Sequence, residues 1–134
     1  MLSVFPDLLA FGLVAPLLLR LSLGVLFLEF GWKKLAGDRE KKTAFFETLG
    51  LRPGAYYAVG FGTLEVVCGL MLIVGLYTQV AALIALAISG SAYALKKKYP
   101  EHFKNDRYFF FLLVVISFSL LFSGAGFLAF DLPL

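Results

Sequence analysis

The sequence predicts an all-α integral membrane protein, a four-helix antiparallel bundle with a short interfacial helix in its first cytoplasmic loop. Three observations predict this fold. Of the 134 residues, 60% are hydrophobic and only 16% are charged, and the mean hydropathy is +0.89. Soluble domains carry about 25% charged residues, so lipid must cover much of the apolar surface of so small a chain. The apolar residues form four runs, and nearly all the basic residues lie in two of the intervening loops.

The four apolar runs predict the spans of one transmembrane domain, 1–134, at about 8–32, 55–76, 80–95 and 108–127. The first run would extend for about 37 Å as a helix, which exceeds the hydrocarbon core of about 30 Å. We expect its helix to begin near Pro6 or Asp7 and to be kinked at Pro16. Gly24 and Gly31 lie seven residues apart on one face, where a neighbouring helix can approach closely.

The first loop, 33–54, predicts a short helix with Asp38 as its N-cap and Gly50 as its stop. Phe45, Phe46 and Leu49 would share one face of this helix, and basic residues fill its first turn. That pattern favours a helix lying on the membrane surface. The alternative is an ordinary ordered loop packed on the bundle.

The basic residues predict the orientation of the chain in the membrane. Loop 33–54 holds six Lys or Arg and loop 96–107 holds five, so eleven of the twelve lie on one side of a four-span bundle. The positive-inside rule makes both loops cytoplasmic and places the N- and C-termini outside. We expect localisation in a bacterial or archaeal cytoplasmic membrane.

The twelfth basic residue, Arg20, lies in the middle of the first span. A charge at that depth costs about 2.5–3.5 kcal/mol, so a partner is expected. Glu65 lies near the centre of the second span, at what we take to be a similar depth, and we predict an Arg20–Glu65 ion pair near the midplane. Two interpretations stay open: the pair only fixes helix register, or it forms an intramembrane polar site for a quinone, an anion or a proton. Candidate secondary donors are Ser22, Tyr56, Tyr57, Ser89, Ser91 and Tyr93.

Glu29 and Lys33 are secondary candidates for this polar site. Their i,i+4 spacing near the predicted cytoplasmic interface favours a local ion pair, and a share in the polar site is the alternative.

No self-contained catalytic motif is present, and no catalytic residue is assigned. Cys68 is the only cysteine, so the chain cannot cycle a disulfide, and a cysteine-based quinone reductase is excluded. His102 is the only histidine and lies in a loop, and no His/Cys/Asp/Glu cluster has metal-ligand spacing. We therefore expect no metal and no covalently bound cofactor. The basic loops adjoin membrane spans, which favours topology signals and anionic-lipid contacts over nucleic-acid binding.

A series of short glycine-containing motifs runs through nearly the whole chain. They are Arg20 followed by Gly24, Gly31-Trp32-Lys33-Lys34-Leu35, Gly50-Leu51, Gly62-x-x-Glu65-x-x-x-Gly69, Gly75-Leu76-Tyr77-Thr78, and Gly124-Ala125-Gly126 before Asp131. In order and spacing they resemble the DoxX family of small four-helix membrane proteins. At the C-terminal motif, Ala125 and Ala129 replace the proline and the serine of the family pattern.

The resemblance implies an integral membrane protein. Some DoxX-like proteins are described as subunits of membrane oxidoreductases, including one acting on thiosulfate and quinone, and others are linked to redox-stress complexes. Carried over by position, the resemblance draws attention to Arg20, Glu65 and Lys33.

Three functions follow as hypotheses. The first is a membrane subunit or accessory factor of a quinone-linked redox assembly, with a quinone near Arg20 and Glu65 and electrons supplied by a partner. The second is a small proton-coupled transporter or channel with Glu65 as the coupling carboxylate. The third is an assembly factor for other membrane proteins. The expected partners are the lipid bilayer and either other membrane or membrane-associated proteins or further copies of this chain, without nucleic acid.

Overall fold

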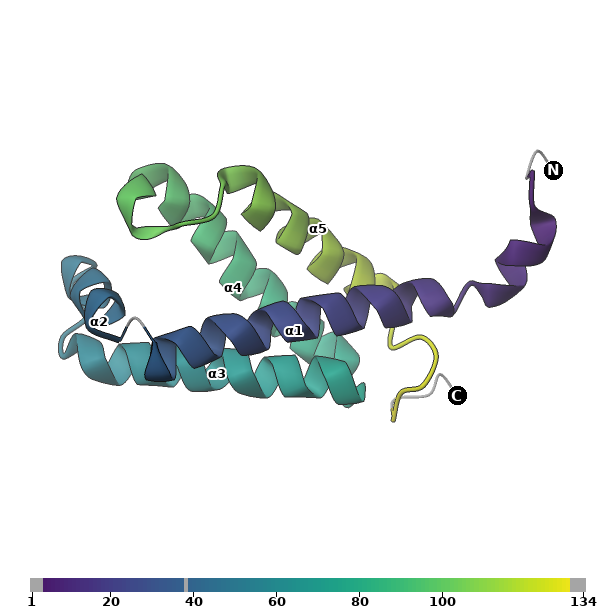
Figure 1. The fold of residues 1–134 in the computed structure, drawn as a ribbon, viewed down its shortest axis with the longest axis horizontal. Helices are drawn as coiled ribbons and strands as arrows, with labels where there is room; N and C mark the ends of the chain where they lie inside the picture. The colour runs from purple at the N-terminus through teal and green to yellow at the C-terminus, as the bar shows by residue number, and fades with distance from the viewer. Residues whose placement is uncertain (1–3, 38, 131–134) are drawn as a thin grey trace.

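The structure, a computed structural model, describes residues 4–37 and 39–130, and all the regular structure within them is helical (Figure 1). The all-α class is therefore confirmed for these residues. Helices α1, α3 and α4 are each long and apolar enough to cross a membrane, and α5 is a shorter apolar helix of 17 residues. The elements in order are η1 (Pro6–Phe11), α1 (Val14–Ala36), α2 (Arg39–Thr48), α3 (Gly54–Val74), α4 (Thr78–Lys98), η2 (Pro100–His102) and α5 (Arg107–Ser123).

Helix α1 begins later than the sequence predicts. Pro6–Phe11 forms a separate 3-10 helix, and the α-helix starts only at Val14. Pro16 is therefore the third residue of α1 instead of an interior residue. The first four N–H groups of a helix have no partner within it, so a proline there removes no helical hydrogen bond. The physical reason for the predicted kink at Pro16 is absent.

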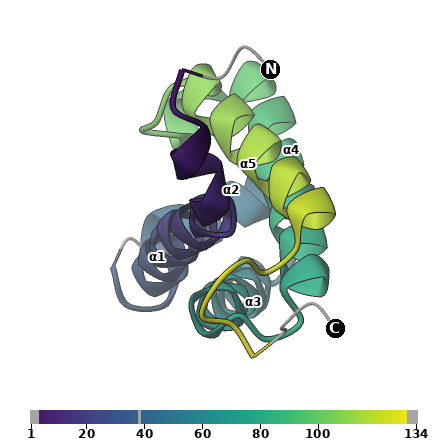
Figure 2. The same cartoon turned by 90° about the vertical axis from the view of Figure 1, so that its right-hand side faces the viewer.

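The long helices form two pairs. Helix α1 packs mainly against α3, and α4 mainly against α5, as Figures 1 and 2 show. Residues 4–13 and 124–130 lie at one end of the molecule, which we call the terminal end (Figure 1). Toward the other end, where α2 and residues 96–107 lie, the two pairs diverge (Figure 1). We call this second end the lysine-rich end.

Glycines set the register between α1 and α3. A Cβ atom added at Gly31 would lie 2.6 Å from the carbonyl oxygen of Gly62, and one added at Gly69 would lie 2.7 Å from that of Gly24. Gly24 thus faces Gly69, and Gly31 faces Gly62, in an antiparallel pair. Only residues without a side chain allow backbones this close. The close-approach face predicted from Gly24 and Gly31 is confirmed.

The core lies between the two helix pairs and is built from aliphatic, aromatic and small residues. Alanines on α4 let the pairs approach each other, while many large apolar side chains on the outer faces stay exposed, which suits contact with lipid. Buried core residues include Leu23, Phe27, Leu72, Ala81, Ala82, Ala85, Leu113 and Leu120.

The helix predicted in the first loop is present as α2. Its residues Phe45 and Phe46 are buried, and the Phe46 ring stacks on Phe61 of α3 with centroids 5.3 Å apart. Gly50 has a φ of +83°, and the Leu51 N–H donates to the Phe46 carbonyl at 3.1 Å, so this glycine ends the helix as predicted. The predicted N-cap, Asp38, lies outside the described residues.

Candidate functional site

Arg20 is buried, with 1% of its surface exposed, and it holds the C-terminal segment against the bundle. Its Nη2 atom donates to the carbonyl oxygens of Leu128 at 2.9 Å and Phe127 at 3.3 Å. The Phe127 N–H in turn donates to the Leu13 carbonyl at 3.1 Å. Gly126 lies so close to α1 that an added Cβ would be 2.8 Å from the Leu13 oxygen. Arg20 therefore ties residues 126–128 to the start of α1.

The predicted ion pair between Arg20 and Glu65 is wrong. The Arg20 Nη1 atom lies beside Gly75, which follows Glu65 by ten residues, or about 15 Å along a helix. The prediction assumed that the middle of each apolar run lies near the midplane of the membrane. The Gly24–Gly69 and Gly31–Gly62 contacts instead place Arg20 near the end of α3.

Glu65 is paired with Lys34 instead. The Lys34 Nζ atom donates to Glu65 Oε1 at 2.5 Å, and the two side chains are 17% and 3% exposed. The other carboxylate oxygen, Oε2, is buried and accepts no hydrogen bond from any residue that the structure describes. The Ser89 hydroxyl on α4 is buried and lacks a partner in the same part of the chain. Two buried polar groups therefore keep unused hydrogen-bonding capacity.

Glu65 and Ser89 both line one cavity of about 420 Å³, which extends toward the lysine-rich end. Helices α1 to α5 and the segment between α4 and α5 all contribute to its wall. One part of it is aromatic, formed by the buried Phe27, Phe45 and Phe110 and the partly exposed Phe30 and Phe103, together with Glu65 and Ser89. Its more exposed part carries lysines from three segments: Lys33, Lys34, Lys41, Lys42 and Lys104.

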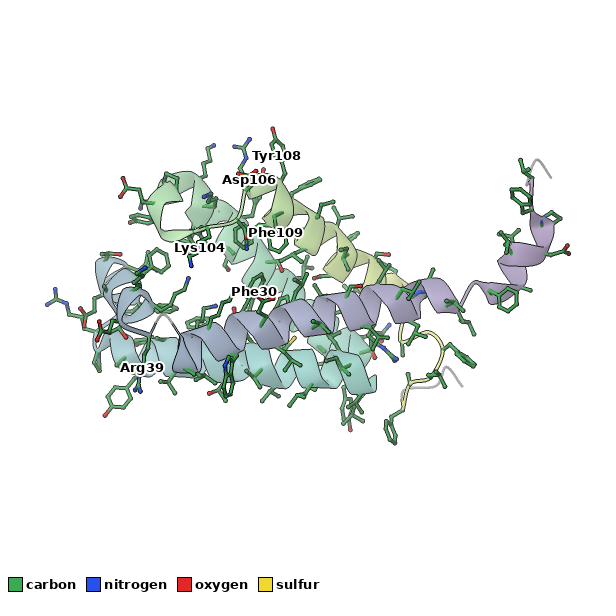
Figure 3. The ribbon with its side chains drawn as sticks, viewed as in Figure 1. Phe30, Arg39, Lys104, Asp106, Tyr108 and Phe109 are labelled. Atoms are coloured by element: carbon green, nitrogen blue, oxygen red, sulfur yellow. The ribbon has the colours of Figure 1, made fainter. Side chains whose placement is uncertain are left out.

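Edge-to-face aromatic contacts hold this wall together. Phe103 contacts Phe45 of α2 with ring centroids 5.4 Å apart and Phe110 of α5 at 5.5 Å. Phe30 of α1 contacts Phe109 of α5 at 5.9 Å. Figure 3 shows Phe30 extending from α1 toward α5, and Lys104 extending from the α4–α5 connection toward α2. These rings link elements that are distant in the sequence, and so they position the cavity.

The local pair predicted between Glu29 and Lys33 is confirmed. The Lys33 Nζ atom donates to Glu29 Oε1 at 2.7 Å, and both side chains are about half exposed. Lys33 lines the cavity, whereas Glu29 does not.

Lys34 is the site residue that the sequence analysis missed. The signal for it was present, because Arg20, Gly24, Phe27, Gly31 and Lys34 follow one another at alternating spacings of four and three residues. Such spacing places them on one helix face, the face that packs against α3. Ser89, in contrast, was among the predicted secondary donors.

The site offers hydrogen bonding and proton exchange inside an aromatic enclosure. Glu65 Oε2 can accept a hydrogen bond or a proton, and the Ser89 hydroxyl can donate or accept a hydrogen bond. Within residues 4–37 and 39–130, no group of three His, Cys, Asp or Glu side chains could hold a metal ion.

Comparisons with known proteins identify the family of this chain. The family model for DoxX matches residues 15–96, which include Arg20, Lys34, Glu65 and Ser89. A Bacillus subtilis protein named "Putative oxidoreductase CatD" is 33% identical over 119 residues, covering 88% of this chain and 85% of that protein. An uncharacterized membrane protein of Mycobacterium tuberculosis is 33% identical over 79 residues, covering 59% of this chain and 48% of the relative. No solved structure gives a significant match. The chain therefore belongs to the DoxX family and is an integral membrane protein.

Proposed function

We propose that this protein is a membrane subunit or accessory factor of a quinone-linked redox assembly, and that the buried part of the cavity binds the quinone ring. One observation carries the proposal: Glu65, whose buried Oε2 atom accepts no hydrogen bond from the described residues, lines an aromatic cavity. The relative from Bacillus subtilis, which is named as an oxidoreductase, supports the redox class.

The proposal includes a topology of four spans, with α5 as the fourth and α2 lying at the interface. As a helix, α5 is about 26 Å long, close to the hydrocarbon thickness of about 30 Å. Eleven of the twelve basic residues lie at the lysine-rich end, which supports a cytoplasmic location for that end and an outside location for both termini. The cavity then lies near the cytoplasmic surface of the membrane.

The residues present fit a quinone. The cavity volume of about 420 Å³ is within the range of small-molecule sites, about 300–1,000 Å³. Its aromatic side chains suit a flat ring, and rings prefer offset or edge-on contacts of the kind already present in the wall. Ser89 and Glu65 supply two unused polar groups for the oxygens of the ring.

A bound quinone would supply two-electron, two-proton carrier chemistry. Phe27, Phe30 and Phe110 would hold the ring and exclude water. The Ser89 hydroxyl would donate to a ring carbonyl. In the reduced form, Glu65 Oε2 would accept a hydrogen bond from a ring hydroxyl and could take its proton as the electrons pass to the partner protein, while Lys34 holds Oε1 and fixes the carboxylate. In this proposal a partner protein exchanges the electrons.

An azido-quinone crosslinking experiment on the purified protein tests the proposal. We expect labelling of peptides that contain Phe27 or Phe30, and about a tenfold or larger loss of labelling in Glu65→Gln, because a hydrogen bond to a charged group contributes about 1.5–3 kcal/mol. Glu29→Gln makes the same change at an exposed carboxylate outside the cavity and is the matched control. Equal labelling of wild type and Glu65→Gln would contradict the quinone site.

A native pull-down in mild detergent, followed by mass spectrometry, tests the assembly. We expect an oxidoreductase subunit among the retained proteins. Recovery of copies of this chain alone, together with loss of proton-coupled flux in Glu65→Gln liposomes, would favour the transporter hypothesis. Retention of immature membrane proteins instead would favour the assembly factor.

A further inference from the structure

We propose that the lysines of the same cavity bind the phosphate headgroup of an anionic phospholipid. The lipid would come from the leaflet at the lysine-rich end, which the positive-inside rule predicts to be cytoplasmic. This inference concerns the exposed part of the cavity and does not rest on quinone binding in the buried part.

The first argument is the convergence of charge. Lys33 and Lys34 come from α1, Lys41 and Lys42 from α2, and Lys104 from the connection before α5, yet all five line one cavity. The acidic residues that line it are Glu65 and Glu101, which leaves an excess of three positive charges. Two remain in excess when Glu29, the partner of Lys33, is also counted.

A topology signal alone does not explain this convergence. The positive-inside rule requires basic residues in a loop but not at any particular place in it. Arg52, Lys97 and Lys98 meet that requirement equally well, and they are exposed without lining the cavity. The cavity lysines thus form a separate group, defined by where the fold places them.

The second argument is the apolar wall between the lysines. Ala44, Phe45 and Phe103 line the cavity beside Lys41 and Lys42, and the Lys42 Nζ atom lies 5.8 Å from the centre of the Phe103 ring. A small soluble anion would use only the lysines. A phospholipid would use both surfaces, with its phosphate at the lysines and its first acyl carbons against the apolar wall. This combination of surfaces favours the lipid.

Native mass spectrometry tests the inference. The purified protein is equilibrated with equal amounts of phosphatidylglycerol, which is anionic, and phosphatidylcholine, which is zwitterionic. We expect the wild type to retain phosphatidylglycerol preferentially. Each lysine near an anionic lipid contributes about a fivefold gain in affinity, so Lys41→Gln/Lys42→Gln should weaken retention about 30-fold. Lys97→Gln/Lys98→Gln removes the same charge outside the cavity and should retain the lipid as the wild type does.

Three outcomes would overturn the inference. They are equal retention of the two lipids by the wild type, equal loss in both double variants, and displacement of the lipid by inorganic phosphate, which would identify a site for a soluble anion. If Lys41→Gln/Lys42→Gln does not elute as a folded species, Lys104→Gln replaces it, with an expected loss of about fivefold. The quinone proposal is tested separately, because its measure is azido-quinone labelling of Glu65→Gln.

Discussion

Two buried charges of this membrane protein lie at different positions along the helices and have different partners: Arg20 lies near the terminal end, and Glu65 lies near the middle of α3. At the terminal end, Arg20 donates to the backbone carbonyls of Phe127 and Leu128. Near the middle of α3, Glu65 is held by the Lys34 side chain, and its other oxygen accepts no hydrogen bond from the residues that the structure describes. Each arrangement lowers the cost of a charge within the membrane, but the groups involved differ in what else they can do.

A backbone carbonyl neither takes up a proton nor changes its charge, so these two contacts of Arg20 are suited to holding the chain in place. A cavity of about 340 Å³ at that end, beside Leu13 and Gly126, has no charged side chain in its wall among the residues that the structure describes. Glu65 instead lines a cavity with aromatic rings and lysines. The depth of an ionisable residue in a membrane span therefore does not by itself indicate a function. What distinguishes Glu65 from Arg20 is the cavity that it lines, together with a carboxylate oxygen that accepts no hydrogen bond from the described residues.

The largest effect on stability is expected for Lys34→Gln. It leaves Glu65 as a buried charge without its ion-pair partner, which typically costs about 3–5 kcal/mol. Thermal unfolding in detergent, followed by circular dichroism, measures the loss. The double variant Lys34→Gln/Glu65→Gln removes both charges and should recover most of it. If the double variant is no more stable than Lys34→Gln, the two residues are not coupled and the contrast with Arg20 fails.

Arg20→Ala should cost somewhat less, about 2–3 kcal/mol, because it deprives two carbonyl groups of their buried donor. Its distinguishing consequence is local: the C-terminal segment should detach, and limited proteolysis should cleave it faster. Arg20→Lys keeps the charge but loses the planar guanidinium, so an intermediate rate is expected. We expect quinone labelling per folded molecule to be unchanged in Arg20→Ala. A loss of labelling as large as that in Glu65→Gln would mean that Arg20 belongs to the site after all.

The helical class and the close contact of α1 with α3 could be predicted from the sequence, since both depend on signals within single helices. Hydropathy identifies apolar helices, and glycines seven residues apart identify a close-approach face. The partner of Arg20 could not be found in this way. Two of its acceptors are main-chain carbonyls in an irregular segment. Every residue type carries a main-chain carbonyl, so the sequence does not show which of them accepts the hydrogen bond.

The partner of Glu65 could have been predicted, and the error is instructive. The spacing from Gly31 to Lys34 places the lysine on the face that packs against α3, and the glycine register brings it near Glu65. The centres of the apolar runs instead gave Arg20 and Glu65 a similar depth, although α1 starts at Val14 and ends at Ala36. The cavity itself depends on α2 and on residues 99–106 packing over diverging helices, which no local pattern predicts.

The smallest effect is expected for Lys33→Gln, the neighbour of Lys34. Its pair with Glu29 is about half exposed, and exposed i,i+4 pairs contribute about 0.3–0.5 kcal/mol. The two variants lie one residue apart and remove the same charge, so any difference between them reports the surroundings of each lysine. The same thermal unfolding measurement in detergent should detect almost no change for Lys33→Gln. A loss close to that of Lys34→Gln would mean that charge at the end of α1 stabilises the fold as a whole, and the special position of the Lys34–Glu65 pair would then lose its support.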